Sequence, residues 1–305
     1  MKMKHIVWIM VLLLLMGCGG GGEETPAVNM VETVTTAPTN TAVSPTNTPI
    51  PPAPVTEVDM EAVAEEEEEV VEEAATTAPE PIAEPADLGG TITTTLTITA
   101  SDGLPMHATY YAPVSSSLRP AIILLHMLGS NRKAWLPTGL PQELVNNGRY
   151  HVLTLDMRGH GQTGGAKDWP LAEEDVQLVW QWLVDQPGVD GEKTAVIGGS
   201  IGSNMALRTG ANIEAVNTVV LLSPGLDYRG VTTEDALVVW GKRPLLIVAS
   251  EEDGYAADSS LALAEQAEGE VELQMYQSAG HGTNMFNAEP ELTTLIVDWL
   301  QNHWE

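Results

Sequence analysis

Residues 195–202 read Ala-Val-Ile-Gly-Gly-Ser-Ile-Gly, a short apolar run that passes directly into a glycine-rich turn. The turn contains the pattern G-x-S-x-G with Ser200 at its centre. In this pattern the serine sits on a sharp turn between a buried strand and a helix, and small residues are needed at 198 and 202 because neighbouring backbones approach closely. The free amides and positive dipole of the helix N-terminus lie behind the serine. The stretch therefore predicts a strand-to-helix turn that presents a candidate nucleophile.

Two other interpretations of this turn are weaker. A glycine-rich loop before a helix can cradle a phosphate, but that use requires a Gly-Lys-Ser or Gly-Lys-Thr sequence, which this turn lacks. It can also be a turn without chemistry. The position of the pattern between an apolar run and a helical segment favours the nucleophilic serine over both.

Further apolar runs on both sides of this stretch predict a sheet. Runs that are apolar on both faces indicate strands buried on both sides, as in a parallel sheet covered by helices. Besides 195–197, the predicted strands of this series are 121–125, 152–155, 219–222, 245–249 and 271–276.

An antiparallel hairpin precedes the series. Residues 91–100 alternate Thr with Ile and Leu, Asp102-Gly103 is a hairpin turn signal, and residues 106–112 form the partner strand. Helical stretches fall between the later runs, at 173–185, 201–209, 259–267 and 292–303. The sequence thus predicts an α/β fold: a mostly parallel eight-stranded sheet with an N-terminal antiparallel hairpin and helices on both faces.

The loop after the run 121–125 reads His126-Met127-Leu128-Gly129-Ser130. It resembles the His-Gly-x-Gly oxyanion loop of the α/β-hydrolase superfamily, with Met127 where glycine is usual. With the strand order and the serine turn, this resemblance implies that the backbone amides of Leu128 (or, less favoured, Met127) and Ile201 hold an oxyanion. The His126 side chain itself is expected to be structural.

The general base is expected among the seven histidines of the chain. His281 lies between two glycines just past the last predicted strand, where the superfamily has its catalytic histidine. His160 is the other candidate, but residues 156–163 resemble the D-x-R-G-x-G-x-S/T turn, which is structural in the same superfamily. The remaining histidines lie in the signal segment, the hairpin, the amino edge of a strand and the last helix: His5, His107, His151 and His303.

The acid that orients the histidine is expected after the run 245–250. Three carboxylates follow one another there, at positions 251 to 253. The superfamily pattern places the acid at Asp253, which would fix the imidazole tautomer and stabilise the imidazolium. Glu252 and Asp227 remain alternatives. The order Ser200, Asp253, His281 is the order of the α/β-hydrolase superfamily.

Residues 1–18 are expected to be a lipoprotein signal peptide. Two lysines precede an apolar run of 11 residues, 6–16, which is shorter than the roughly 20 residues of a membrane-spanning helix. The run leads into Leu15-Met16-Gly17-Cys18, which resembles the bacterial lipobox and contains the only cysteine of the chain. The resemblance implies acylation of Cys18 (palmitate among its chains), an extracytoplasmic location and a membrane anchor. An ordinary signal peptide with an incidental cysteine is the alternative.

The rest of the chain divides into two parts by composition. Residues 19–88 are rich in Thr, Pro and Glu, with 16 acidic residues and no Lys or Arg, and are expected to be a disordered tether. Residues 89–305 are expected to form the single hydrolase domain. Lys+Arg 13 against Asp+Glu 42 gives a net charge of −29, which argues against binding to nucleic acid. One cysteine rules out an intrachain disulfide.

Substrate access is expected to be open. Only 22 residues separate Leu222 from Leu245, where lidded relatives insert long helical segments, so no sizeable cap is expected. Within this segment, residues 223–228 are expected to line the site and residues 232–239 to form one short helix. Trp135, Trp169 and Tyr255 are expected to serve local packing more than a substrate wall. The resemblance is closest to capless esterases of the dienelactone-hydrolase type and to serine aminopeptidase-like members.

The expected activity is hydrolysis of small or exposed carboxylic esters through an acyl-enzyme. It needs no metal or organic cofactor, and the protein is expected to be a monomer whose partners are its substrate and the membrane. A peptidase or amidase, and a catalytically silent binding module with the same fold, are the alternatives.

Overall fold

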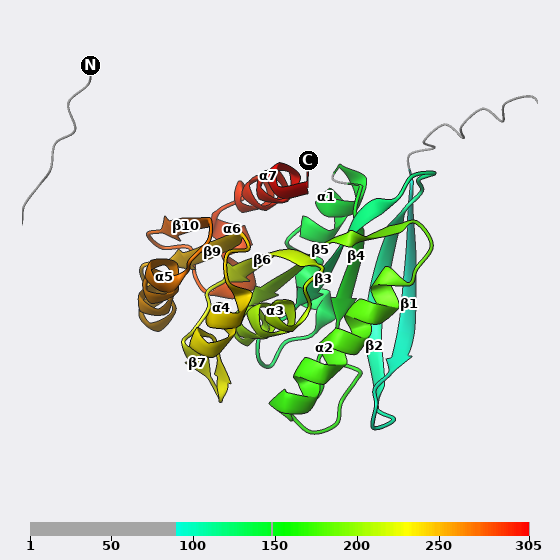
Figure 1. The fold of residues 1–305 in the computed structure, drawn as a ribbon, viewed down its shortest axis with the longest axis horizontal. Coiled ribbons are helices and arrows are strands. Elements are labelled where there is room, and N and C mark those ends of the chain that lie inside the picture. The colour runs from blue at the N-terminus through cyan, green and yellow to red at the C-terminus, as the bar shows by residue number, and fades with distance from the viewer. Residues whose placement is uncertain (1–89, 148, 305) are drawn as a thin grey trace, which may run out of the picture. The chain divides into compact units, whose positions relative to one another are not determined.

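An eight-stranded sheet forms the centre of the domain in the computed structural model, which describes residues 90–147 and 149–304 (Figure 1). The strands lie in the order β1-β2-β4-β3-β5-β6-β9-β10. The β1–β2 and β2–β4 pairs are antiparallel and all other neighbours are parallel. The strands are β1 Thr91–Thr99, β2 Pro105–Pro113, β3 Arg119–Leu125, β4 His151–Leu155, β5 Val189–Gly199, β6 Val216–Leu222, β9 Leu245–Ser250 and β10 Val271–Tyr276. The predicted sheet is confirmed.

Helices cover both faces of the sheet. α2, α3, α4 and α5 contribute to one buried apolar cluster, and α1, α6 and α7 contribute to a second. Side chains of each parallel strand alternate between them: Ile123 and Leu125 join the first cluster, and Ile122 and Leu124 the second. The helices are α1 Leu140–Asn146, α2 Trp169–Val184, α3 Ile201–Asn212, α4 Glu234–Trp240, α5 Gly254–Gln266, α6 Met285–Ala288 and α7 Leu292–Trp304.

The segment between β6 and β9 holds no large cap. It contains a two-stranded hairpin, β7 (Asp227–Tyr228) and β8 (Val231–Thr232), followed by the short helix α4. Sequence analysis predicted one helix from Thr232, whereas Thr232 belongs to β8. The predicted helix 259–267 begins earlier, at Gly254. A glycine start lowers local helix propensity, so the first turn depends on tertiary contacts that composition does not reveal.

Residues 156–163 form a buried structural turn, as their resemblance implied. Arg158 Nε donates to Asp175 Oδ2 at 2.8 Å, and Arg158 Nη1 donates to Asp102 Oδ2 at 2.6 Å. The His160 ring is buried, with Nδ1 2.9 Å from the Arg158 carbonyl oxygen. These contacts fix the turn to α2 and to the hairpin, and they engage His160 away from the role of a base.

The predicted signal peptide and tether lie outside the described residues. No helix among residues 90–147 and 149–304 is both long and apolar enough to span a membrane.

Candidate active site

The site lies at the carboxyl ends of five neighbouring strands. β3, β5, β6, β9 and β10 stand next to one another in the sheet and run parallel, so the loops that follow them meet at one edge. This is the edge where ligands bind in open α/β sheets. The loops carry all the residues predicted for the site.

Ser200 occupies the strained turn that its sequence pattern predicts. Its φ is 55° and its ψ is −124°, a conformation that non-glycine residues rarely adopt. It precedes α3 as the N-cap residue, but its side chain makes no capping hydrogen bond. The Ser200 amide donates to the Leu222 carbonyl oxygen at 2.8 Å, which fixes the turn to β6. Strain of this kind persists where surrounding structure enforces it, and it concentrates at functional sites.

The glycines on either side of Ser200 are required by close backbone approach, as predicted. A Cβ at Gly198 would lie 2.0 Å from the Gly202 carbonyl oxygen. A Cβ at Gly202 would lie 2.5 Å from the Leu125 carbonyl oxygen. Side chains at either position would therefore push the turn away from β3 and from its own helix.

The structure brings His281 and Asp253 together. His281 Nδ1 lies 2.5 Å from Asp253 Oδ2, a distance typical of a charge-assisted hydrogen bond in which the ring donates to the carboxylate. The His281 side chain is 36 % exposed and that of Asp253 is 22 % exposed. Asp253 is the N-cap of α5, yet its carboxylate makes no capping bond and is free to engage the imidazole. The pair leaves Nε2 of His281 as the ring nitrogen available for proton transfer.

Three side chains position the loop that carries His281. Glu252 Oε1 accepts from the Gly280 amide at 2.9 Å, and its other oxygen accepts from Ser278 Oγ at 2.5 Å. Ser250 Oγ accepts from the Ala279 amide at 2.8 Å. Ser223 Oγ accepts from the Gly282 amide at 2.9 Å. Glu252 is therefore engaged with this loop and not with the imidazole.

Asp227, the other alternative acid, stabilises the turn of the β7–β8 hairpin. Its Oδ1 accepts from the Gly230 amide at 2.6 Å, and the residue is exposed. The structure thus pairs Asp253 with His281 and gives the two competing carboxylates backbone partners of their own.

Ser200 lies against the His281 loop. A Cβ at Gly282 would be 3.5 Å from the Ser200 nitrogen, and a Cβ at Gly199 would be 3.4 Å from the Thr283 nitrogen. Within the described residues, the hydrogen bond from Ser200 Oγ to the His281 ring is not formed. Catalytic hydrogen bonds are often long in ligand-free sites and tighten when substrate binds.

The oxyanion loop after β3 is fixed by the His126 side chain. His126 Nδ1 donates to the Met127 carbonyl oxygen at 2.7 Å, and Nε2 accepts from the Met157 amide at 3.1 Å. Burial lowers the pKa of His126 to about 4, which keeps the ring neutral near pH 7. The structural interpretation of this histidine is confirmed. Leu128 follows in the same loop, and Ile201 begins α3; the backbone amides of these two residues remain the predicted oxyanion donors.

The Met127 side chain fills the space between the serine turn and the histidine loop. Its Sδ would lie 2.5 Å from a Cβ at Gly282, and its Cγ would lie 3.3 Å from a Cβ at Gly199. The departure from the usual glycine at this position therefore adds a thioether that packs across the base of the site.

The sequence predicted that residues 223–228 line the site, but not the roles of Ser223 and Asn204 in holding the loops around it. Ser223 is fully buried, has a φ of 54°, and holds the His281 loop. Asn204 on α3 donates to the carbonyl oxygens of Gly225 and Val231, at 2.8 and 2.7 Å, and so fixes both ends of the β7–β8 hairpin. The available signal was a serine directly after an apolar strand, at the edge where the site forms.

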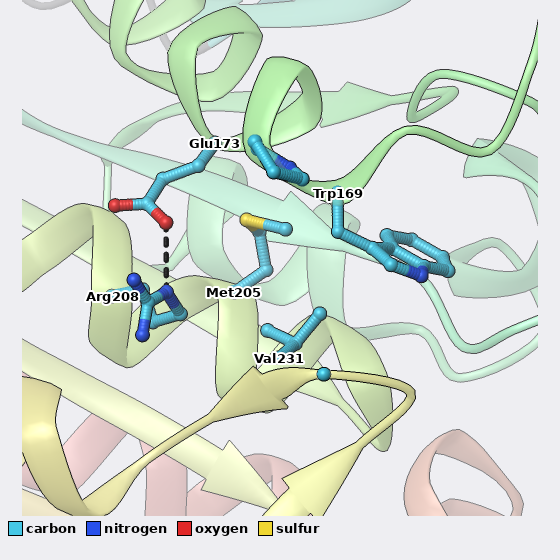
Figure 2. A pocket seen from close by; sticks show the side chains of 7 residues that line it. Trp169, Glu173, Met205, Arg208 and Val231 are labelled. Carbon is cyan, nitrogen blue, oxygen red and sulfur yellow. Dashed lines mark hydrogen bonds and ion pairs between the residues drawn. The ribbon is translucent and has the colours of Figure 1, made fainter.

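The aromatic residues have different surroundings. Trp135 is fully buried and belongs to the core, and Tyr255 hydrogen-bonds through its hydroxyl to the backbone of Asp227. Trp169 is half-buried and lines a cavity of about 110 Å³ beside α3, where Glu173 and Arg208 form an ion pair (Figure 2). The cavity lining is Trp169, Pro170, Glu173, Met205, Arg208, Gly230 and Val231.

No group of three or more His, Cys, Asp or Glu side chains is placed to hold a metal ion anywhere in residues 90–147 and 149–304.

The profile of the alpha/beta hydrolase family matches residues 122–300. The match covers more than half of the chain, and the chain therefore belongs to the alpha/beta hydrolase family. No curated protein matches it.

Solved structures with the same fold include several esterases. The acetyl xylan esterase from Paenibacillus sp. R4 is 16% identical, covers 72% of this chain and 87% of its own, and gives a TM-score of 0.59. The carboxylesterase EstE1, cloned from a metagenomic library, is 18% identical, covers 70% and 90%, and gives 0.58. The dienelactone hydrolase from Anabaena variabilis is 18% identical, covers 70% and 99%, and gives 0.58. At these identities the likeness concerns the fold.

Proposed function

We propose that this hydrolase is a serine esterase that cleaves carboxylic esters of small or exposed substrates through an acyl-enzyme. The observation that carries the proposal is the 2.5 Å hydrogen bond between His281 and Asp253, on a loop that packs against the strained Ser200 turn. A hydroxyl on such a turn needs an adjacent base to become a nucleophile, and the oriented imidazole is suited to that role. The esterases among the similar folds, and the small β7–β8 and α4 insertion, are consistent with this substrate class.

The proposed reaction has two halves. Ser200 Oγ attacks the ester carbonyl while His281 takes its proton, and the amides of Leu128 and Ile201 hold the oxyanion. His281 then gives the proton to the departing alcohol oxygen, with Asp253 stabilising the imidazolium. Water attacks the acyl-enzyme, again with His281 as the base, and releases the acid. Oxyanion donors and the base each contribute on the order of 10²–10⁴ in rate.

A substrate panel tests the proposed class. The purified protein is assayed with nitrophenyl esters of increasing acyl length and with the matching nitroanilides and aminoacyl anilides. We expect the highest kcat/KM for short-chain esters, because the segment between β6 and β9 contains only a two-stranded hairpin and one short helix. Higher kcat/KM for aminoacyl anilides would identify a peptidase instead. Turnover of none of these substrates, with no labelling by a fluorophosphonate probe, would identify a silent binding module.

We also propose that the protein acts outside the cytoplasm, held to a bacterial membrane by lipid on Cys18. The support is the sequence that precedes Cys18, which resembles a site of acylation. Acyl chains contribute roughly 0.8 kcal/mol per buried methylene to membrane binding, so several chains would hold the protein at a membrane. Metabolic labelling of bacteria that express the full chain, using an alkyne palmitate analogue, is expected to label the wild type but not Cys18→Ser. Labelling of Cys18→Ser at the wild-type level would contradict the proposal.

A further inference from the structure

Tyr228 on the β7–β8 hairpin lies against the histidine of the proposed triad. Its ring lies 6.4 Å from the His281 ring, centroid to centroid, at an interplanar angle of 87°. Ser200 and the Asp253 carboxylate both lie close enough to act on the phenol, because Ser200 lowers the pKa of Tyr228 and the charge of Asp253 raises it. No role is assigned to Tyr228 by the reaction described above.

The Tyr228 ring is held in this place before substrate binds. A Cβ at Gly225 would lie 2.7 Å from Tyr228 Cζ, so only glycine lets the ring pack on this backbone. Asn204 fixes Gly225 by hydrogen bonds to both its amide and its carbonyl group, at 3.0 and 2.8 Å. Tyr255 also packs against the Tyr228 ring, with 5.6 Å between the ring centroids. A donor fixed in advance needs little reorganisation during a reaction, which is what makes it effective.

The Tyr228 hydroxyl is a weakly engaged donor. It donates to the Ser223 carbonyl oxygen at 3.3 Å, well beyond the usual 2.7–2.8 Å for such bonds. Burial, and then the charge of Asp253, raise the pKa of Tyr228, so the phenol stays protonated throughout the neutral range. The group can therefore exchange its long bond for a better acceptor, and it acts as a donor and not as a base.

We propose that Tyr228 is a further catalytic residue of the Ser200 site, whose hydroxyl donates a hydrogen bond to the alcohol oxygen of the ester as that oxygen departs. The inference rests on the proposed function. The departing oxygen must face His281, which protonates it, and the Tyr228 ring lies against the His281 ring. The two oxyanion amides come from the other loops, after β3 and β5.

The step balances without a proton from Tyr228. The carbon–oxygen bond of the tetrahedral intermediate breaks, and its electron pair goes to the alcohol oxygen. That oxygen receives the proton of the His281 imidazolium and leaves as a neutral alcohol, while Tyr228 keeps its own proton. An ester oxygen has two lone pairs, so it accepts from Tyr228 and still takes the proton. A departing amine nitrogen has one lone pair, which the proton occupies, so the arrangement favours esters over amides.

The test is Tyr228→Phe, measured with a series of acetate esters whose alcohols range from nitrophenol to ethanol. Because kcat/KM covers steps through acylation, it reports the departure of the alcohol. We expect kcat/KM to fall about 10²-fold for alkyl acetates, whose oxygens carry the most charge on departure, and less than about 5-fold for nitrophenyl acetate. Phenylalanine keeps the ring against His281 and removes only the hydroxyl.

Tyr255→Phe is the matched control, since it removes the other hydroxyl of the same aromatic pair. We expect Tyr255→Phe to lower kcat/KM by the same factor for every ester in the series, because the Tyr255 hydroxyl is hydrogen-bonded to the Asp227 backbone. If Tyr228→Phe leaves kcat/KM unchanged, or lowers it equally for all esters, this inference is wrong while the esterase proposal still holds. A wild type that hydrolyses none of the esters, or a Ser200→Ala variant that still does, would overturn the proposed function and this inference with it.

Discussion

Replacement of Ser200 by alanine is expected to reduce kcat/KM for nitrophenyl acetate by at least about 10³-fold, to the level of binding and oxyanion contacts alone. The reason is that alanine keeps the backbone turn and the Cβ but removes the only group proposed to form the covalent bond. The measurement is steady-state hydrolysis, beside thermal unfolding of both proteins. A Ser200→Ala variant that turns over within about 10-fold of the wild type would exclude Ser200 as the nucleophile.

A second substitution at the same position separates catalysis from stability. Ser200→Gly is expected to be as inactive as Ser200→Ala but more stable than it by about 1 kcal/mol. Glycine relieves a φ of 55° and a ψ of −124° that cost alanine and serine roughly 1–3 kcal/mol, and it loses part of this gain to the entropy of the unfolded chain. Chemical denaturation compares the two variants directly. Equal stabilities would contradict the strain assigned to this turn.

The second large effect concerns the acid. Asp253→Asn is expected to lower kcat on the order of 10³-fold while leaving the fold intact, because an amide neither fixes the required imidazole tautomer nor stabilises the imidazolium. The variant retains the size of the side chain beside His281. The measurement is steady-state hydrolysis of nitrophenyl acetate by the variant and the wild type, beside thermal unfolding of both proteins.

Glu252→Gln is the matched control for Asp253→Asn. The two positions are adjacent and both substitutions exchange a carboxylate for its amide. The amide side chain introduced by Glu252→Gln can still accept from the Gly280 amide through its oxygen, so the loss is expected to stay below about 10-fold. A larger loss in Glu252→Gln than in Asp253→Asn would transfer the role of the acid to Glu252.

The sheet could be predicted because its strands differ so clearly from their surroundings. β3, β4, β6 and β9 are apolar on both faces, which only a doubly covered sheet explains. β1 alternates Thr with Ile and Leu, but only its Ile98 is buried, and Ile92 is exposed. The close backbone contacts at Gly198 and Gly202 could also be predicted, because the serine turn itself requires them.

The acid and the surroundings of the site depend on tertiary contacts that spacing does not determine. Three consecutive carboxylates follow β9, and only the structure shows that Glu252 reaches the loop backbone while Asp253 reaches the imidazole. The β7–β8 hairpin is held by Asn204 and Tyr255, which lie far from it in sequence. The place of Tyr228 over His281 was therefore outside what residue patterns could reveal, although the segment 223–228 was expected near the site.

The most direct measurement is to map the covalent adduct of a fluorophosphonate probe by mass spectrometry of the purified, folded protein. Our account predicts one phosphonylated residue, Ser200, with labelling greatly slowed in His281→Ala because the hydroxyl has lost its base. An active preparation that carries the adduct on a different residue, or labels at the same rate without His281, would contradict it.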